Sequence, residues 1–305
     1  MPVLVNREGG AAAKAGDGLR DTIRAAFAEA NAAADVSLLA ADEMADAIKA
    51  ASEKAPRIAV AGGDGTMACA AQALRGGRTE LALLPLGTLN HLARDLKIPT
   101  DIKAAAQLAA HGEAIAIDLG TANGEAFVNN ASIGLYPEMV REREAVRGRR
   151  KWPKWLATLP AAWDTLARLR HHRLRVNWGH GDRPLVTPLL FVGNGLYSLE
   201  QGAVGCRDTL QGGTLGIYAV AHRSRAALIW FALRAIAGRA DRRTDFVMVG
   251  ESEGLKVDAH RGEIEMAMDG EVRRATMPLH FAVERQALKV VARPAGSDAA
   301  PVPGK

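Results

Sequence analysis

The feature that most constrains the fold is a glycine-rich junction between a short apolar run and a helical pattern. Residues 58–61 are apolar, the stretch 62–66 reads Gly-Gly-Asp-Gly-Thr, and an alanine-rich helical pattern begins at once. Glycines at the end of a strand let the backbone turn tightly and approach another group closely. The junction therefore predicts a strand that opens through a loop directly into a helix.

The same alternation extends over residues 1–118. Apolar runs with the length of strands alternate with segments in which apolar residues recur at helical spacing. Strands that alternate with helices predict βαβ units around a parallel sheet, so we expect an α/β domain over residues 1–118. The expected strands are 2–6, 36–40, 57–61 and 80–87, and the expected helices are 17–34, 41–54, 66–76, 88–96 and 101–112.

The pattern changes after about residue 115. Short strands follow one another at close spacing, and Asn123-Gly124 is a strong hairpin signal. This pattern predicts a β-rich antiparallel sandwich domain over residues 119–280. The remaining expectations are helical segments near 150–170 and 223–238, a final strand within 281–293 and a disordered tail over 294–305.

Composition excludes several classes of protein. The chain has 305 residues and is 48% hydrophobic, which excludes an intrinsically disordered protein. Its two cysteines exclude a disulfide framework and fit a reducing cytosol. The start lacks the regions of a secretory signal, and the longest apolar run, 226–238, is interrupted by Arg234. That run is shorter than the ~20 residues of a membrane span, so we expect no transmembrane helix.

Basic charge is concentrated in one segment. The chain carries a net charge of +5, whereas residues 141–175 contain eleven Lys/Arg and three Asp/Glu, a net charge of +8. The segment also holds Trp152, Trp155 and Trp163. A basic helix with aromatic anchors is typical of a membrane interface, so we expect peripheral membrane contact through residues 149–170. A core-packing helix with a solvated basic face is the alternative; no nucleic-acid motif accompanies the segment.

The glycine-rich junction has the chemistry of a phosphate-binding loop. Free N–H groups at a helix N-terminus and close backbone approach both suit a phosphate, and Thr66 is expected to cap the helix or to donate to a phosphate oxygen. The Walker sequence is absent. Residues 63–68 match a dinucleotide fingerprint loosely, but they lack the acidic residue expected about 20 positions later. A glycine-capped turn without a ligand is the remaining alternative.

A second loop of the same kind follows the next expected strand. Pro85, Gly87, Thr88 and Asn90 stand where that strand opens into a helix. In a parallel sheet the ends of neighbouring strands line one crevice. Two such loops in succession indicate a phosphate ligand more strongly than one does.

Five segments, taken in order, resemble the diacylglycerol kinase catalytic-domain family, which includes bacterial soluble lipid kinases and the sphingosine kinases. They are "NREGG", "GGDGT", "PLGTLN", "IDLG…FVNNASIG" and "MDGE". The GGDGT segment also occurs in NAD kinases, with similar loops in phosphofructokinases, but the "GSTAY" segment of NAD kinases is absent. The resemblance covers the chain to about residue 293. It implies an NAD kinase/phosphofructokinase-like nucleotide-binding domain followed by a β-rich lipid-binding domain, with the strand in 281–293 returning to the first domain.

The resemblance also implies site residues, with ATP and Mg²⁺ as cofactors. Asp64 and Asp118 would position Mg²⁺, and Asp64 has no evident backbone role that another residue could not fill. Glu271 or Asp269 would act as general base for a lipid hydroxyl, although Asp-Gly at 269–270 is also an ordinary hairpin signal. The residues implied for ATP are Asn6, Gly62, Gly63, Gly65, Thr66, Gly87, Thr88 and Asn90.

Four positions depart from the family pattern, the first being Arg7, which stands where proline is usual after Asn6. His91 stands where the family often has aspartate after the Asn of its GTxN segment. Gly212 and Gly216 replace the two aspartates of a "DGxLD" segment that is linked to a structural Mg²⁺. We therefore expect that structural metal site to be absent.

These observations predict an ATP- and Mg²⁺-dependent lipid kinase, cytoplasmic and peripheral to the inner membrane face. It would phosphorylate a hydroxyl of diacylglycerol or a related lipid, and no motif specifies which lipid. The alternatives are a catalytically impaired lipid- or nucleotide-binding homologue and a kinase for a soluble acceptor, as NAD kinases are. We expect no nucleic-acid partner, and the sequence leaves oligomerisation open.

Overall fold

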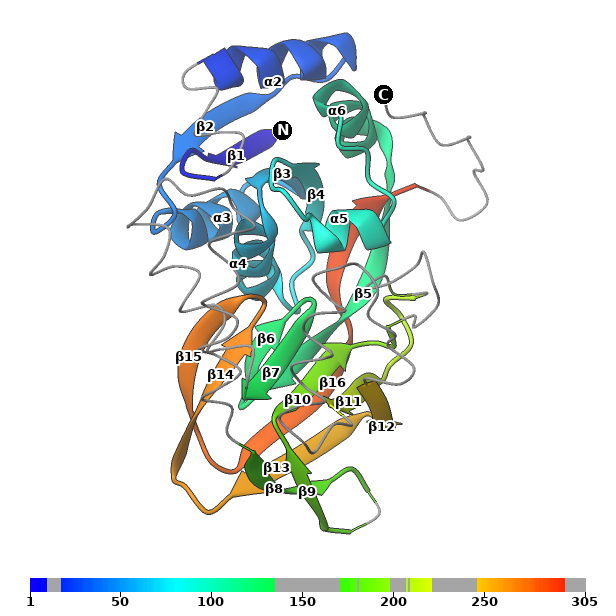
Figure 1. The fold of residues 1–305 in the computed structure, drawn as a ribbon. Helices are drawn as coiled ribbons and strands as arrows, with labels where there is room; N and C mark the ends of the chain where they lie inside the picture. Colours follow the sequence, from blue (N-terminus) through cyan, green and yellow to red (C-terminus); the bar gives the residue numbers. More distant parts are fainter. Residues whose placement is uncertain are drawn as a thin grey trace, which may run out of the picture. The chain divides into compact units, whose positions relative to one another are not determined.

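The computed structural model describes two compact units, and the strands β5 (Glu113–Ala122) and β16 (Leu279–Ala292) contribute residues to both (Figure 1). The first unit comprises Met1–Ile117 with Gln286–Lys305, and the second comprises Asp118–Arg285. The residues described are 1–9, 18–134, 171–179, 181–197, 207, 209–220 and 246–293.

Several predicted features lie outside the described residues. They are the helical segments near 150–170 and 223–238, the membrane contact at 149–170 and the tail at 294–305. Among the residues that the structure describes, no helix has the length and hydrophobicity needed to cross a bilayer.

The first unit is built on a parallel sheet with the strand order β2-β1-β3-β4-β16. The central strands carry continuous runs of buried apolar residues in their interiors because both of their faces are covered. The strands are β1 (Pro2–Asn6), β2 (Asp35–Leu39), β3 (Arg57–Gly62), β4 (Glu80–Pro85) and β16 (Leu279–Ala292), and the helices are α2 (Gly18–Glu29), α3 (Met44–Ser52), α4 (Asp64–Leu74), α5 (His91–Asp95) and α6 (Ile102–His111).

Helices cover both faces of this sheet, with α2 and α6 on one face and α3 and α4 on the other (Figure 1). Ile23 and Phe27 of α2, one helical turn apart, pack with Val3 and Val5 of β1 in a single buried cluster. The helix α6 starts at a capping residue, because the Asp101 side chain accepts a hydrogen bond from the third residue beyond it. The resulting α/β/α layering fixes the carboxyl ends of β3 and β4 side by side.

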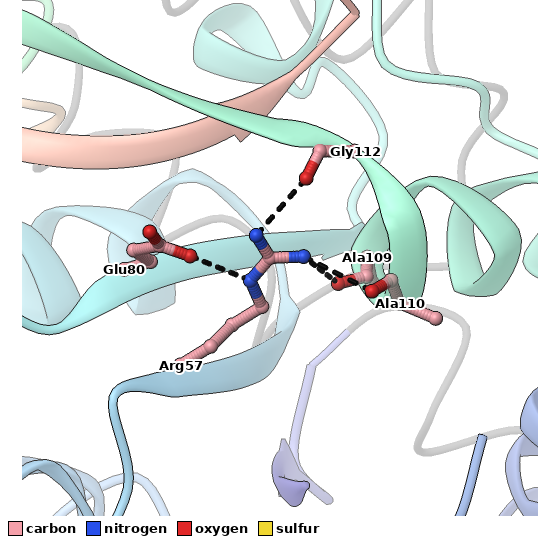
Figure 2. A network of polar contacts seen from close by, with 5 residues as sticks. All are labelled: Arg57, Glu80, Ala109, Ala110 and Gly112. Atoms are coloured by element: carbon pink, nitrogen blue, oxygen red, sulfur yellow. Dashed lines mark hydrogen bonds and ion pairs between the residues drawn. The ribbon is translucent and has the colours of Figure 1, made fainter.

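Arg57, at the start of β3, connects the amino end of this strand to α6 (Figure 2). Its Nε donates to Glu80 Oε2 at 2.7 Å. Its two Nη atoms donate to the backbone oxygens of Ala109, Ala110 and Gly112 at 3.0, 3.1 and 2.9 Å. A guanidinium satisfies the carbonyl groups that a helix C-terminus leaves without partners, so Arg57 stabilises the end of α6.

The second unit is a sandwich of two sheets. One has the order β12-β11-β10-β7-β14-β15, and the other contains β16-β13-β8-β9 with the β5–β6 hairpin. Apolar residues from both sheets, among them Ile133, Ile217, Val257 and Phe281, form one buried cluster. The strands are β5 (Glu113–Ala122), β6 (Glu125–Phe127), β7 (Asn130–Gly134), β8 (His172–Asn177), β9 (Arg183–Thr187), β10 (Leu189–Asn194), β11 (Leu215–Val220), β12 (Phe246–Ser252), β13 (Gly254–Ala259), β14 (Glu263–Met268) and β15 (Glu271–Thr276).

The predicted fold class is confirmed: a parallel α/β unit is combined with a β-rich antiparallel unit. Two strands, β9 and β15, had not been predicted. Both lie at sheet edges, where charged residues and Pro184 are tolerated and the apolar alternation that marks a strand is weak. The helix predicted at 88–96 starts only at His91, because Asn90 adopts a left-handed conformation with φ of 48°.

Candidate active site

The carboxyl end of β3 passes into α4 with a single residue between them. Gly63 is extended, with φ of −94° and ψ of −169°, and α4 begins at Asp64. Glycine has no side chain with which to cap the helix, so the N–H groups of the first turn are not occupied by their own cap residue. Backbone N–H groups in this position attract anions, most of all phosphate.

The loops that follow β3 and β4 touch through their glycines. A Cβ atom built on Gly87 would lie 2.7 Å from Gly63 Cα and 2.6 Å from Asn90 Oδ1. A Cβ atom built on Gly62 would overlap the side chain of Thr66. Real Cβ contacts are essentially never this short, so a side chain at Gly87 would push the two loops apart and one at Gly62 would displace Thr66. We call residues 62–66 and 87–91 the glycine loop pair.

Asp64 joins the two loops. Its Oδ2 accepts a hydrogen bond from the Asn90 backbone N–H at 3.0 Å, and its Oδ1 accepts from the His91 N–H at 2.6 Å. The carboxylate thus caps the short helix α5 from a neighbouring loop. Asp64 therefore has a backbone role that was not evident from the sequence, because the N–H groups that it holds are 26 and 27 residues away.

Asn90 closes the second loop on itself. Its Oδ1 accepts from the Gly87 N–H at 3.0 Å, and its Nδ2 donates to the Gly87 carbonyl at 2.8 Å. The left-handed conformation at Asn90 is one that asparagine tolerates better than most residues. Between these two residues, Thr88 and Leu89 project outward, and the Leu89 side chain is 52% exposed.

Asn6, at the end of β1, completes the cluster in the first unit. Its Nδ2 donates to Thr66 Oγ1 at 3.0 Å, and its Oδ1 accepts from the Glu8 N–H at 3.0 Å. Thr66 is buried, and its hydroxyl proton remains to be donated. The residues predicted to bind ATP, from Asn6 to Asn90, therefore lie together at the carboxyl ends of β1, β3 and β4.

In the second unit, Asp118 has a structural role. Its side chain is buried, and its Oδ2 accepts from the Gly213 N–H at 2.7 Å. Its own N–H donates to the Leu210 carbonyl at 2.8 Å, so Asp118 holds the 209–214 segment against β5. Within the described parts of the chain, no three His, Cys, Asp or Glu side chains gather in a way that would hold a metal ion.

Gly216, one of the departures from the family pattern, lies where β11 is crowded. A Cβ atom built there would come within 2.7 Å of the Tyr218 ring and 2.9 Å of the Gly195 carbonyl oxygen. An aspartate would not fit without movement of the backbone. At Gly212 the nearest atom would be Thr209 Cγ2 at 3.4 Å, so the space there is ordinary.

The two carboxylates predicted as general bases differ in their surroundings. Asp269 Oδ2 accepts from the Val128 N–H at 2.7 Å, and its Oδ1 accepts from the Asn129 and Asn130 N–H groups at 2.7 and 3.2 Å. Glu271, two residues later at the start of β15, is exposed; its Oε2 lies 3.1 Å from Arg273 Nη2. Of the two, Glu271 has oxygen lone pairs directed to solvent.

Burial raises the pKa of the Asp269 carboxyl above its ordinary value, while its three N–H partners and the charge of Arg207 act in the opposite direction. Arg207 itself was not predicted from the sequence. It is only 5% exposed, and it donates to the carbonyls of Val128 and Asn194 at 2.6 and 3.0 Å and to Asn129 Oδ1 at 3.1 Å. No motif surrounds Arg207, so only its burial reveals it.

Comparison with known proteins bears on this site. The family model described as the diacylglycerol kinase catalytic domain matches residues 1–122, which contain the glycine loop pair. The protein named "Probable lipid kinase YegS-like" of Cronobacter sakazakii is 39% identical over 99 residues, covering 31% of this chain and 33% of that protein. The "Diacylglycerol kinase" of Staphylococcus carnosus is 31% identical over 105 residues, 34% of each chain. The chain thus spans about a third of the length of these curated relatives.

A solved structure extends the similarity in fold to nearly the whole chain. The crystal structure titled as a diacylglycerol kinase of Bacillus anthracis str. Sterne has a TM-score of 0.68, with 96% of this chain and 97% of that chain covered. The identity is 20%, so the likeness is one of fold. Over residues 1–122, the chain is therefore similar to the diacylglycerol kinase catalytic domain family.

Proposed function

We propose that the protein is an ATP-dependent lipid kinase that transfers the γ-phosphoryl group to a hydroxyl of diacylglycerol or a related lipid. The observation that carries the proposal is the glycine loop pair. Two glycine loops in backbone contact, at the ends of adjacent parallel strands and held by one aspartate, form a surface that suits a chain of phosphates. The family of residues 1–122 and the names of the relatives agree with it.

In this proposal the first unit binds the nucleotide. The N–H groups at Gly63 and Gly65 face the phosphates, whereas the Gly87 N–H is held by Asn90 Oδ1, so Gly87 contributes a close approach of the backbone instead. The hydroxyls of Thr66 and Thr88 donate further hydrogen bonds, and Asn6 orients Thr66. Phosphoryl transfer depends mainly on such positioning and on neutralisation of charge.

Asp64 fits a Mg²⁺ ion that arrives with ATP. Each of its oxygens accepts one N–H and keeps a second lone pair, which suits contact with the hydrated ion. When bound, Mg²⁺ would neutralise phosphate oxygens. Asp118 is a weaker candidate for a metal ligand, because one of its oxygens is used by Gly213 and its side chain is buried.

Glu271 acts as the general base in this proposal. It accepts the proton of the lipid hydroxyl, the hydroxyl oxygen bonds to the γ-phosphorus, and the bond from that phosphorus to ADP breaks. A positioned carboxylate contributes about 10²- to 10⁴-fold to such a step. Exposure of Glu271 supports this choice over Asp269, whose oxygens are occupied by backbone N–H groups.

Contact with a membrane surface is supported by one face of the second unit. Arg173 and Arg175 of β8 and Lys256 of β13 alternate with buried residues and project from the same exposed face of the sheet. Val186, opposite Arg173 in the register, is 47% exposed. We propose that this face, together with the segment at 149–170, contacts the inner membrane surface from the cytoplasm.

This contact predicts weaker binding to anionic vesicles when Arg173 and Lys256 are each replaced by alanine. Each charge near an anionic surface is worth about 1 kcal/mol, or roughly fivefold in affinity. Unchanged vesicle binding at low salt would remove this face from the proposal.

The kinase itself is tested with γ-labelled ATP, Mg²⁺ and mixed vesicles that contain diacylglycerol. We expect labelled lipid from the full chain, a large loss in Asp64→Asn and Glu271→Gln, and no loss in the control Glu263→Gln, an exposed residue of β14. Binding of ATP without labelled lipid would favour the impaired binding homologue. Label on NAD or another soluble acceptor would favour a kinase for a soluble substrate.

A further inference from the structure

The turn between β14 and β15 is held from outside. Asp269 and Gly270 both have positive φ, 48° and 90°, as in a two-residue type I′ turn, and Met268 pairs with Glu271 across it. Glu271 is therefore the first residue after the turn. Its position depends on how firmly the turn is fixed, because a hairpin end is otherwise free to bend.

Four hydrogen bonds fix this turn to residues 128–130, the last of which is the first residue of β7. Three N–H groups, of Val128, Asn129 and Asn130, donate to the Asp269 carboxylate at 2.7, 2.7 and 3.2 Å. In return the Asp269 N–H donates to the Asn130 carbonyl at 2.9 Å. A hairpin that needed Asp269 only for its turn conformation would not require the carboxylate to meet three donors.

Arg207 supports the same segment from its other side. Its guanidinium holds the carbonyl oxygen of Val128 at 2.6 Å and the side chain of Asn129 at 3.1 Å. Asn194 adds a hydrogen bond from its Nδ2 to the Val128 carbonyl at 3.0 Å. The segment 128–130 thus presents its N–H groups to a carboxylate and its carbonyl groups to a cation and an amide. We call these residues with Asp269 the Asp269 cluster.

The arrangement separates the two carboxylates of the Asp-Gly-Glu stretch by role. The Asp269 carboxylate accepts three backbone N–H groups, two of them on Oδ1, so a proton on Oδ1 would cost a hydrogen bond. Glu271 makes one side-chain ion pair, at the surface, and can gain a proton without loss of a backbone contact. The Asp269 carboxylate therefore holds backbone N–H groups in place, whereas the exposed Glu271 carboxylate can accept a proton from a substrate.

We propose that Asp269, supported by Arg207, is a positioning residue that fixes the turn bearing Glu271 and acts on phosphoryl transfer only through Glu271. This inference rests on the proposed function in that Glu271 is the base. Its structural half, the fixing of the turn by Asp269 and Arg207, stands on the hydrogen bonds of the second unit alone.

The catalytic half is tested by a double-mutant cycle on the full chain. Single variants Asp269→Asn and Glu271→Gln are compared with the double variant, with kcat, KM for ATP and the pH profile of kcat/KM as readouts. We expect Glu271→Gln to lower kcat by about 10²- to 10⁴-fold and to remove the acid limb of the profile. We expect Asp269→Asn to lower kcat by about 10-fold with KM for ATP unchanged and the acid limb retained.

In the double variant, Asp269→Asn should cause no further loss of kcat, because its effect passes through Glu271. An additive loss, or disappearance of the acid limb in Asp269→Asn alone, would overturn the proposal. A purely structural residue would lower the fraction of folded enzyme without coupling to Glu271.

The structural half is tested without activity, by hydrogen exchange of the backbone amides at 128–130 and 269–271. We expect faster exchange in Asp269→Asn and in Arg207→Lys, which keeps the charge but not the planar set of donors, and unchanged exchange in Glu263→Gln. Unchanged exchange in both cluster variants would overturn the proposal even if the protein phosphorylates lipids. If the wild-type protein phosphorylates no lipid but the exchange results hold, the proposed function fails and the fixing of the turn stands.

Discussion

Each unit of the protein contains an aspartate, next to a glycine, that gathers backbone N–H groups from a distant part of the chain. Asp64 holds the N–H groups of Asn90 and His91 at the start of α5, and Asp269 holds those of residues 128–130. Both carboxylates join two segments that lie far apart in the sequence and that no local hydrogen bond could hold together. In each case the aspartate fixes a loop beside the residues to which we assign chemistry.

The difference between the two lies in what surrounds the carboxylate. Asp64 has two N–H donors at the edge of the first unit, and each oxygen keeps a lone pair for a ligand. Asp269 has three N–H donors and lies within reach of the charge of a buried arginine. We call Asp64 the open aspartate, because its oxygens keep lone pairs for a ligand, and Asp269 the enclosed aspartate, because backbone N–H groups and a buried arginine surround it. The comparison teaches that an aspartate in a glycine-rich stretch can be both structural and functional where it is open, and structural alone where it is enclosed.

The largest expected effect is that of Arg207→Met, which tests the enclosed side of this comparison. The substitution removes the guanidinium donors from the carbonyls of Val128 and Asn194, although Val128 keeps its hydrogen bond from Asn194 Nδ2, and it removes the charge of Arg207 from the surroundings of Asp269. Loss of one member of a buried charged group costs about 3–5 kcal/mol. Urea denaturation should show this loss in the free energy of unfolding, and a loss below about 1 kcal/mol would mean that the guanidinium is not integral to the fold.

Asp64→Asn tests the open side. The amide offers one oxygen where two N–H groups need acceptors, and its NH₂ group faces a donor. We expect a loss of about 1–3 kcal/mol in the free energy of unfolding. Since Mg²⁺ contact is a second role, the Mg²⁺ concentration needed for half-maximal activity should also rise.

Asp269→Asn provides the matched comparison for this second role. It should lower stability by a similar amount and leave the Mg²⁺ requirement unchanged. Equal Mg²⁺ requirements in the two variants would remove the functional distinction between the open and enclosed aspartates.

Gly87→Ala tests whether the contact of the two loops matters for the nucleotide. The added methyl group would lie 2.7 Å from Gly63 Cα, so the loops must separate by several tenths of an ångström. We expect ATP affinity to fall about tenfold, or ~1.4 kcal/mol, measured by titration calorimetry. The control is Gly18→Ala, because a Cβ atom there meets nothing within 4 Å; equal affinities for both variants would contradict the assignment of this loop to ATP.

Much of this arrangement could be predicted from sequence because its signals are local. The glycines of the loop pair, the Asp-Gly turn and the alternation of strands and helices each depend on neighbouring residues. Arg207 and the partners of Asp64 and Asp269 could not be predicted, since these contacts join residues 26 to 141 positions apart. Even the left-handed Asn90, which delays the start of α5, is fixed by its hydrogen bonds to Gly87.

The smallest expected effect concerns pH and Asp269. Burial raises the pKa of this carboxyl in the folded protein above its value of about 3.9 in an unfolded chain. A raised pKa contributes stability that is fully present below pH ~3.9 and is lost as the pH rises through the folded-state pKa. The free energy of unfolding of the wild type, relative to Asp269→Asn, should therefore decline over that window by at most about 1.4 kcal/mol per pH unit. A relative stability that instead increases with pH would mean that the three N–H donors and Arg207 outweigh the effect of burial on Asp269.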